Sequence, residues 1–165
     1  MKHHKYKARP YAPGDLKLMN LLDDEREVIE ANEEFFEALA DKNKTRKTCI
    51  SVCYKGAILF LVGYYEVEPG VAQVFVIPDR RITEHPLAFV RAVKHWRQWL
   101  EKREWCRRIQ TSSLPTKLID HWMRKIGFVC EAKLVSYTES GQDYNLWSRE
   151  KRNGVWGRQE ASSGV

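Results

Sequence analysis

Residues 71–90, VAQVFVIPDRRITEHPLAFV, constrain the fold of this chain more than any other segment. A mostly apolar run ends at Pro78 and predicts a strand, a short charged turn follows, and Pro86 is typical of the first turn of a helix. Strand, turn and helix in this order present backbone N–H groups to an anion, usually a phosphate. We therefore expect an α/β protein in which this crossover binds a phosphorylated cofactor.

Length and composition predict one globular domain. The chain has 165 residues, of which 43% are hydrophobic, and this is enough to bury a core. Its longest apolar run, 57–62, is the length of a strand, and no run approaches the ~18 residues of a membrane span. The basic N-terminus lacks the apolar segment of a secretory signal. We expect a cytoplasmic protein without a membrane partner, with a basic flexible segment at 1–8, a domain at 9–148 and a polar tail at 149–165.

Charge and cysteine content limit the partners and cofactors. The net charge of +6 favours anionic partners, which include nucleic acid, a phosphorylated cofactor and the wall of a nucleic-acid-filled particle. Cys49 and Cys53 are close together on one extended segment, but no second pair accompanies them, so we predict no metal site. Reduced thiols in a cytosolic protein are the expected state.

Turn residues and apolar runs predict the remaining elements and their order. Turns at 55–56 and 68–70 join three strands into an antiparallel meander, and helix 86–103 should connect strands 71–77 and 107–111 in parallel. The predicted fold is α/β, a mixed, mainly antiparallel sheet with helices on both faces. The predicted strands are 9–10, 49–54, 57–67, 71–77, 107–111, 128–137 and 144–147, and the predicted helices are 23–40, 86–103 and 115–126, with a charged loop at 41–48.

Apolar side chains at helical spacing predict which helix faces are buried. In helix 23–40 these residues are Val28, Phe35, Phe36 and Leu39. In helix 86–103 they are Phe89, Val93, Trp96 and Leu100, and the opposite face is basic. In helix 115–126 they are Leu118, Ile119, Trp122, Met123 and Ile126. After this last helix, Gly127 is typical of a left-handed C-cap.

The element order and two partial motifs resemble the GCN5-related N-acetyltransferases, the GNAT superfamily. Val76, Pro78 and Arg81 match the family pattern V-x-P-x-x-R-x-x-G-x-G, although Glu84 and Pro86 stand where that pattern has glycines. The later run 125–128, KIGF, matches the family's K-x-G-F. Within the superfamily the chain is similar to small GNAT-like proteins of tailed phages, including those called internal virion protein A.

The resemblance implies acetyl-CoA as cofactor and assigns the residues that would hold it. In the family, backbone groups at the end of the central strand polarise the thioester carbonyl, and the loop amides hold the pyrophosphate. The matching positions here are Val76, Ile77, Arg80, Arg81, Ile82, Thr83 and Glu84. Pro86 has no N–H to donate and Glu84 brings a carboxylate near the phosphates, while Arg80, Arg81 and Lys94 could compensate with charge. The alternative is that 79–85 is only a solvated, capped helix entry.

The resemblance also directs the choice of groups for proton transfer. Family members commonly place a carboxylate near the end of strand 57–67, which makes Glu66 and Glu68 candidate bases, with water as a third route. Met123 stands where the family often has a tyrosine that donates a proton to the leaving thiolate. Methionine cannot donate a proton, so Tyr137 becomes the candidate acid. The alternatives are that the two glutamates belong to an ordinary turn and that Tyr137 is a half-buried sheet residue.

Three functions from different classes follow. The first is an N-acyltransferase that passes an acetyl group from acetyl-CoA to an amine of a small molecule or protein. The second is a non-catalytic GNAT-fold phage protein that binds virion or host proteins, in the host cytoplasm or the virion. The third is a nucleic-acid binder that uses the basic, tryptophan-containing segment 91–108. The sequence does not identify the acceptor amine.

Overall fold

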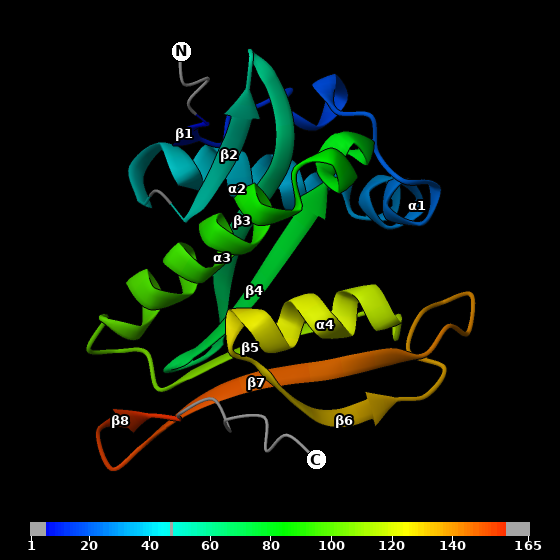
Figure 1. Ribbon diagram of the computed structural model, residues 1–165. Coiled ribbons are helices and arrows are strands. Elements are labelled where there is room, and N and C mark those ends of the chain that lie inside the picture. Colours follow the sequence, from blue (N-terminus) through cyan, green and yellow to red (C-terminus); the bar gives the residue numbers. More distant parts are fainter. Residues whose placement is uncertain (1–5, 47, 158–165) are drawn as a thin grey trace. The chain divides into compact units, whose positions relative to one another are not determined.

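The computed structural model describes residues 6–46 and 48–157, so most of the predicted basic lead-in and residues 158–165 lie outside the described part. Figure 1 shows its helices and strands with their labels. In chain order they are β1 (Lys7–Pro10), η1 (Leu16–Leu18), α1 (Asp23–Ala31), α2 (Glu33–Arg46), β2 (Cys49–Tyr54), β3 (Ala57–Glu68), β4 (Val71–Pro78), η2 (Arg80–Glu84), α3 (Pro86–Glu101), β5 (Arg108–Ser113), α4 (Lys117–Ile126), β6 (Val129–Leu134), β7 (Tyr144–Arg152) and β8 (Val155–Trp156).

The strands form a mixed sheet in which antiparallel pairing dominates. The order is β1-β2-β3-β4-β5-β7-β6, and β8 pairs with β7. Strands β4 and β5 are parallel, with Val71–Gln73 opposite Arg108–Gln110, because α3 carries the chain back between them. The pairs β1–β2, β2–β3, β5–β7, β6–β7 and β7–β8 are antiparallel. The predicted mixed, mainly antiparallel α/β fold is confirmed.

The described chain groups into two compact units. The first runs to Tyr65 and adds Phe75–Phe89, and the second consists of Glu66–Val74 and the chain from Val90 onward. The predicted turn between β2 and β3 lies in the first unit, where Lys55 and Gly56 both have positive φ, 50° and 84°. Such a turn matches the twist of the two strands it joins. The core of the first unit contains Tyr11, Met19, Leu21, Ile29, Leu39, Ala40, Cys49, Ile58, Leu61 and Ile77.

The second unit is built on β5, β7 and β6 with α4. Thr116 caps the N-terminus of α4, where its hydroxyl oxygen accepts from the N–H of Ile119 at 3.2 Å. Gly127 ends the helix at φ 99°, which confirms the predicted left-handed cap. The indole of Trp147 is fully buried and donates to the hydroxyl of Ser113 at 3.0 Å, so a polar atom in this core has its partner.

The predicted helix 23–40 is two helices. Asn32 interrupts it at φ −124°, and its side-chain amide donates to the carbonyl oxygen of Val28 at 2.7 Å. This local bond competes with helical bonding. Beyond the break, α2 continues to Arg46 and includes most of the predicted loop. Val28 and Phe35 are exposed, and Ile29 is buried instead, because the break changes which side chains share a face.

The C-terminal boundary and one buried face also differ from prediction. Strand β7 extends to Arg152 and β8 follows, so residues 149–156 of the predicted polar tail belong to two paired strands and the turn between them. The Trp156 indole anchors this end by donating to the carbonyl oxygen of Glu101 at 2.9 Å. Leu118, predicted to be buried, is 53% exposed. Within the described ranges, no helix is long and apolar enough to cross a membrane, and no cluster of three metal-ligating side chains occurs.

Candidate functional site

The predicted strand–turn–helix crossover is present at the end of β4. The backbone N–H of Asp79 donates to the carbonyl oxygen of Leu59 at 2.8 Å, and an isolated bridge joins Asp79 to Leu21. The chain then turns through the short 3₁₀ helix η2 and enters α3 at Pro86. The first unit therefore holds the crossover from β3 on one side and from residues 20–21 on the other.

Asp79 is the anchor of this crossover. Its carboxylate is fully buried and accepts from the backbone N–H of Asn20 at 2.7 Å and of Arg81 at 2.9 Å. The Arg81 guanidinium adds two bonds of 2.7 Å each. Burial alone would raise the pKa of Asp79, but these hydrogen bonds to the charged form lower it below its ordinary value. Asp79 is therefore a buried, ionised carboxylate that fixes the loop.

The two predicted phosphate-binding arginines are held by the protein's own acceptors. Arg80 donates through Nε to the carbonyl oxygen of Leu21 at 3.0 Å and pairs with Asp23 at 2.6 Å. The side chains of Arg80 and Arg81 are nevertheless 43% and 41% exposed. Because a guanidinium has five N–H donors, these bonds position the arginines without using all of their donors.

The backbone amides of η2 bond mainly within the loop. The N–H of Arg80 donates to the carbonyl oxygen of Asn20 at 2.9 Å. The N–H of Ile82 donates to the carbonyl oxygen of Asp79, and that of His85 to the carbonyl oxygen of Ile82, each at 2.9 Å. These contacts and the i→i+3 bonding of a 3₁₀ helix use the amides that a glycine-rich loop would turn toward a phosphate. Sequence reasoning did not foresee this short helix.

The remaining predicted cofactor residues have different surroundings. Ile77 and Ile82 are buried and serve the core, whereas Thr83 and Glu84 are exposed. The hydroxyl of Thr83 donates to the carbonyl oxygen of Arg80 at 3.3 Å. Val76 is half-buried and lies beyond Gln73, where the parallel register with β5 ends. Exposed polar groups and the end of β4 are thus available in this part of the first unit.

The candidate bases lie at the other end of β4. Glu66 accepts from the backbone N–H of Gly70 at 2.9 Å, and both Glu66 and Glu68 are exposed. They precede β4 in the chain, whereas η2 follows it. In an antiparallel hairpin the start of β3, not its end, lies beside the end of β4. The contact between Leu59 and Asp79 shows this arrangement, and sequence reasoning could have inferred it.

The candidate acid is not close to the candidate bases. Tyr137 is 56% exposed and its ring centroid lies 5.5 Å from that of Tyr144, at the start of β7. The turn that Glu66 binds is next to Arg107, because the N–H of Arg107 bonds to the carbonyl oxygen of Gly70 at 2.9 Å. Arg107 lies beside the far end of β7, since the adjacent Arg108 faces Glu150. Tyr144 and Glu150 are six positions apart along β7, a span of about 20 Å. The structure does not assemble Glu66 and Tyr137 into one site.

The tryptophans of α3 pack against other side chains of the protein. Trp96 is buried, as predicted, and stacks on Trp99 with ring centroids 5.1 Å apart. The Arg103 guanidinium lies 3.8 Å from the centre of the Trp99 ring. The outer face of α3 is basic and exposed, as predicted, with Arg91, Lys94 and Gln98. This face carries the charge of a nucleic-acid site, but its two central aromatic rings already stack on each other.

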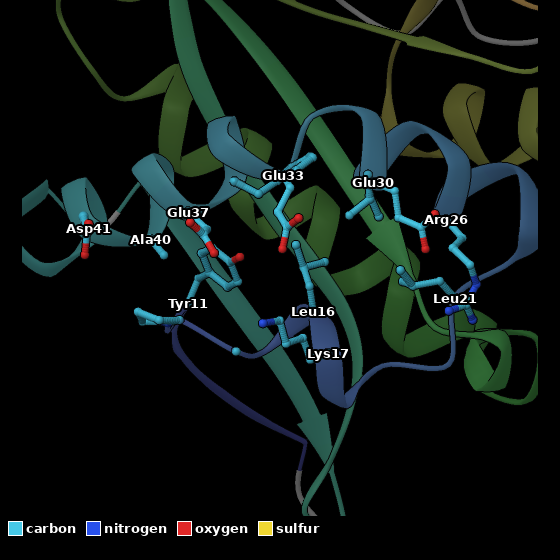
Figure 2. Close-up of a pocket in the computed structure, with 14 residues that line it drawn as sticks. Tyr11, Leu16, Lys17, Leu21, Arg26, Glu30, Glu33, Glu37, Ala40 and Asp41 are labelled. Carbon is cyan, nitrogen blue, oxygen red and sulfur yellow. The ribbon is translucent and has the colours of Figure 1, made fainter.

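Sequence reasoning missed a pocket in the first unit. It has a volume of about 690 Å³ and is lined by the segment that runs from Tyr11 to Leu21 and by helices α1 and α2. Figure 2 shows carboxylates of both helices around it. Acidic residues at spacings of three and four in segment 30–41 were the available signal, but only the tertiary structure brings the apolar residues of segment 11–21 opposite them.

Comparisons with known proteins identify the fold. No protein-family model and no curated protein matches this sequence. The ribosomal-protein-S5-alanine acetyltransferase of Vibrio fischeri is similar in structure, with a TM-score of 0.69, 16% identity, and coverage of 94% of this chain and 98% of that one. An acetyltransferase of the GNAT family from Bacillus anthracis gives 0.66, 14%, 90% and 96%. RimL, the ribosomal L7/L12 α-N-protein acetyltransferase in complex with coenzyme A, gives 0.63, 12%, 88% and 93%.

These structures share the fold of this chain over nearly its whole length. The fold is that of the GNAT acetyltransferases, as the sequence resemblance implied. At identities of 16% or less, this similarity concerns the fold, while the similarity to phage proteins stays a prediction.

Proposed function

We propose that this chain is an N-acetyltransferase that takes an acetyl group from acetyl-CoA and passes it to an amine. The observation that carries the proposal is the whole-chain fold similarity to acetyltransferases, one of which was solved with coenzyme A. Fold similarity alone does not fix an activity, so the proposal also needs groups that could hold the cofactor.

The loop after β4 offers such groups in altered form. The half-exposed guanidiniums of Arg80 and Arg81 are held in place by Asp23 and Asp79. Their remaining N–H donors suit a phosphate. In the first turn of α3, Pro86 has no N–H and the N–H of Phe89 bonds to the carbonyl oxygen of His85, so only the amides of Leu87 and Ala88 could add to these donors. These residues fit a pyrophosphate through side-chain charge rather than through glycine amides, so we expect weaker binding than a glycine-rich loop would give.

The chemistry comes from the thioester. When bound, acetyl-CoA supplies a carbonyl carbon to which an amine nitrogen can bond as the carbon–sulfur bond breaks, which releases coenzyme A as the thiol. Val76 and Ile77 at the end of β4 are the backbone groups proposed to orient that carbonyl. Because Glu66 and Tyr137 lie apart, we propose that the proton of the amine leaves through water rather than through either side chain.

Titration calorimetry with coenzyme A tests this proposal. The wild-type chain should release or absorb heat on binding, and Arg80→Ala should weaken binding several-fold because it removes one phosphate contact. Arg91→Ala is the matched control, since it removes an exposed cation from the outer face of α3. Equal losses in both variants would mean that net charge, not the loop, governs binding. Absence of binding at millimolar coenzyme A would contradict the proposal.

A non-catalytic GNAT-fold binding protein is the second candidate. The internal bonding of the η2 amides and the missing N–H of Pro86 favour it, because both reduce the backbone donors for a phosphate. On this account coenzyme A does not bind, no free thiol appears when acetyl-CoA and a panel of amines are supplied, and a virion or host protein co-purifies with the chain. The detection of thiol release would reject it.

A further inference from the structure

The pocket in the first unit has an apolar interior. Tyr11, Leu16 and Phe36 line it, and Tyr11 is only 5% exposed. Its volume of about 690 Å³ is in the range of small-molecule sites. Figure 2 shows Tyr11 and Leu16 near the two helices that form the other side of the pocket. The interior would accept the aliphatic part of a small ligand.

The pocket carries an acidic rim on a basic protein. Glu30, Glu33 and Glu37 line it, and in Figure 2 their carboxylates lie on the side of α1 and α2 that faces the pocket. Lys17 and Arg26 also line it. In the described chain, however, no ion pair within 4.0 Å joins either cation to these three carboxylates. Glu33 and Glu37 are separated by one helical turn, where like charges destabilise a helix, and a bound cation would relieve this repulsion.

The pocket adjoins the loop that follows β4. Leu21 lines the pocket and forms the bridge to Asp79, while its carbonyl oxygen accepts from Arg80. One short segment thus contributes both to the pocket wall and to the support of the proposed cofactor loop. Within the first unit, a ligand in the pocket and a cofactor at the loop would share this wall.

We propose that the pocket binds an aliphatic diamine as the acetyl acceptor, an inference that rests on the proposed function. The carboxylates of the rim hold one ammonium group by charge complementarity, and the apolar interior holds the carbon chain. The second nitrogen, once neutral, bonds to the acetyl carbon, the carbon–sulfur bond breaks, and the amine proton passes to water while the thiolate leaves and is protonated. Because a free alkylamine has a pKa of about 10.4, turnover should rise with pH above 7.

Titration calorimetry without coenzyme A tests the pocket separately from the transferase activity. The probes are 1,5-diaminopentane, pentylamine and glutarate, which share a five-carbon chain and differ in charge. We expect the diamine to bind most tightly, pentylamine more weakly and glutarate not at all, and we expect diamine binding to weaken with added salt. Equal binding of the three probes, or no diamine binding at millimolar concentration, would overturn the proposal.

Paired variants locate the binding site. The double variant Glu33→Gln/Glu37→Gln should weaken diamine binding roughly three- to tenfold, as expected for two partly screened ion pairs. The control variant Glu27→Gln/Glu34→Gln removes one exposed carboxylate from α1 and one from α2, and neither of these residues lines the pocket. It should change binding less than twofold. Equal effects of the two double variants would reject the pocket. Circular dichroism verifies that both variants fold.

The two proposals can fail independently. Diamine binding without coenzyme A binding would keep the pocket and remove the transferase, and the reverse result would keep the cofactor site and remove the diamine. If both ligands bind, turnover should show saturation with the diamine, and the rim variant should raise KM more than it lowers kcat. An unchanged KM in that variant would show that the acceptor binds elsewhere.

Discussion

Replacement of Asp79 by alanine should destabilise the first unit more than any exposed charge substitution. The change removes a fully buried carboxylate and leaves the backbone N–H groups of Asn20 and Arg81 without their acceptor. Each buried donor left without a partner costs about 1–3 kcal/mol. The Arg81 guanidinium is 41% exposed, so water replaces most of what it loses. We therefore expect a loss of about 3–4 kcal/mol in the free energy of unfolding.

Urea denaturation at pH 7 measures this loss, with Asp23→Ala as the matched control. Asp23 also pairs with a loop arginine, but its side chain is 88% exposed, so its removal should cost less than about 1 kcal/mol. Equal losses in the two variants, or a loss below about 1 kcal/mol for Asp79→Ala, would refute the view that Asp79 anchors the crossover.

Replacement of Asp79 by asparagine should change the response to acid. The pKa of Asp79 is lowered in the folded state, so its ionised form contributes stability that is present above the unfolded pKa of about 3.9 and is lost as pH falls through the lower folded pKa. Wild-type stability should therefore fall below about pH 4 more steeply than that of Asp79→Asn. Parallel curves for the two proteins would show that Asp79 contributes nothing to this acid response.

Three further substitutions test the second unit. Gly127→Ala should cost about 1–3 kcal/mol, because φ is 99° and a Cβ would lie 2.7 Å from a terminal nitrogen of Arg97; denaturation that matches wild type would contradict the close approach. Glu101→Gln should cost about 3 kcal/mol or more, since Glu101 is the acidic partner of the buried Arg97 and of Arg149, whose side chain is 12% exposed; a loss below 1 kcal/mol would show that water solvates these arginines. Glu66→Gln should leave turnover within about twofold, since Glu66 binds its own turn, and a hundredfold loss would restore it as the base.

The sequence predicted correctly those elements whose ends are marked by glycine or proline. The Lys55-Gly56 turn, the cap at Gly127 and the strand that ends at Pro78 depend on the conformational limits of the residues themselves. At the Asn32 break, the side-chain amide of Asn32 bonds to the carbonyl oxygen of Val28. This bond competes with the backbone hydrogen bond that a continuous helix would form there. Apolar spacing could not detect that bond.

The strand–turn–helix crossover was predicted in position but not in detail. The position of the crossover follows from the strand, turn and helix pattern, and the exposed arginines were identified. The internal bonding of η2 was not, because the bonds that Asn20 and Leu21 form with Asp79 and Arg80 link residues about sixty positions apart. Glu66 and Glu68 lie at the end of β3, as expected, and their role as bases stays a prediction.

Thermal unfolding in the presence of acetyl-CoA tests the proposed cofactor most directly. A ligand with a dissociation constant of about 0.1 mM, supplied at about 1 mM, stabilises the folded state by about 1.4 kcal/mol. For a chain of this length the Tm should rise by about 3–5 °C, and the rise should be smaller in Arg80→Ala than in Arg91→Ala. An unchanged Tm at millimolar acetyl-CoA, with the wild-type chain folded, would contradict the account.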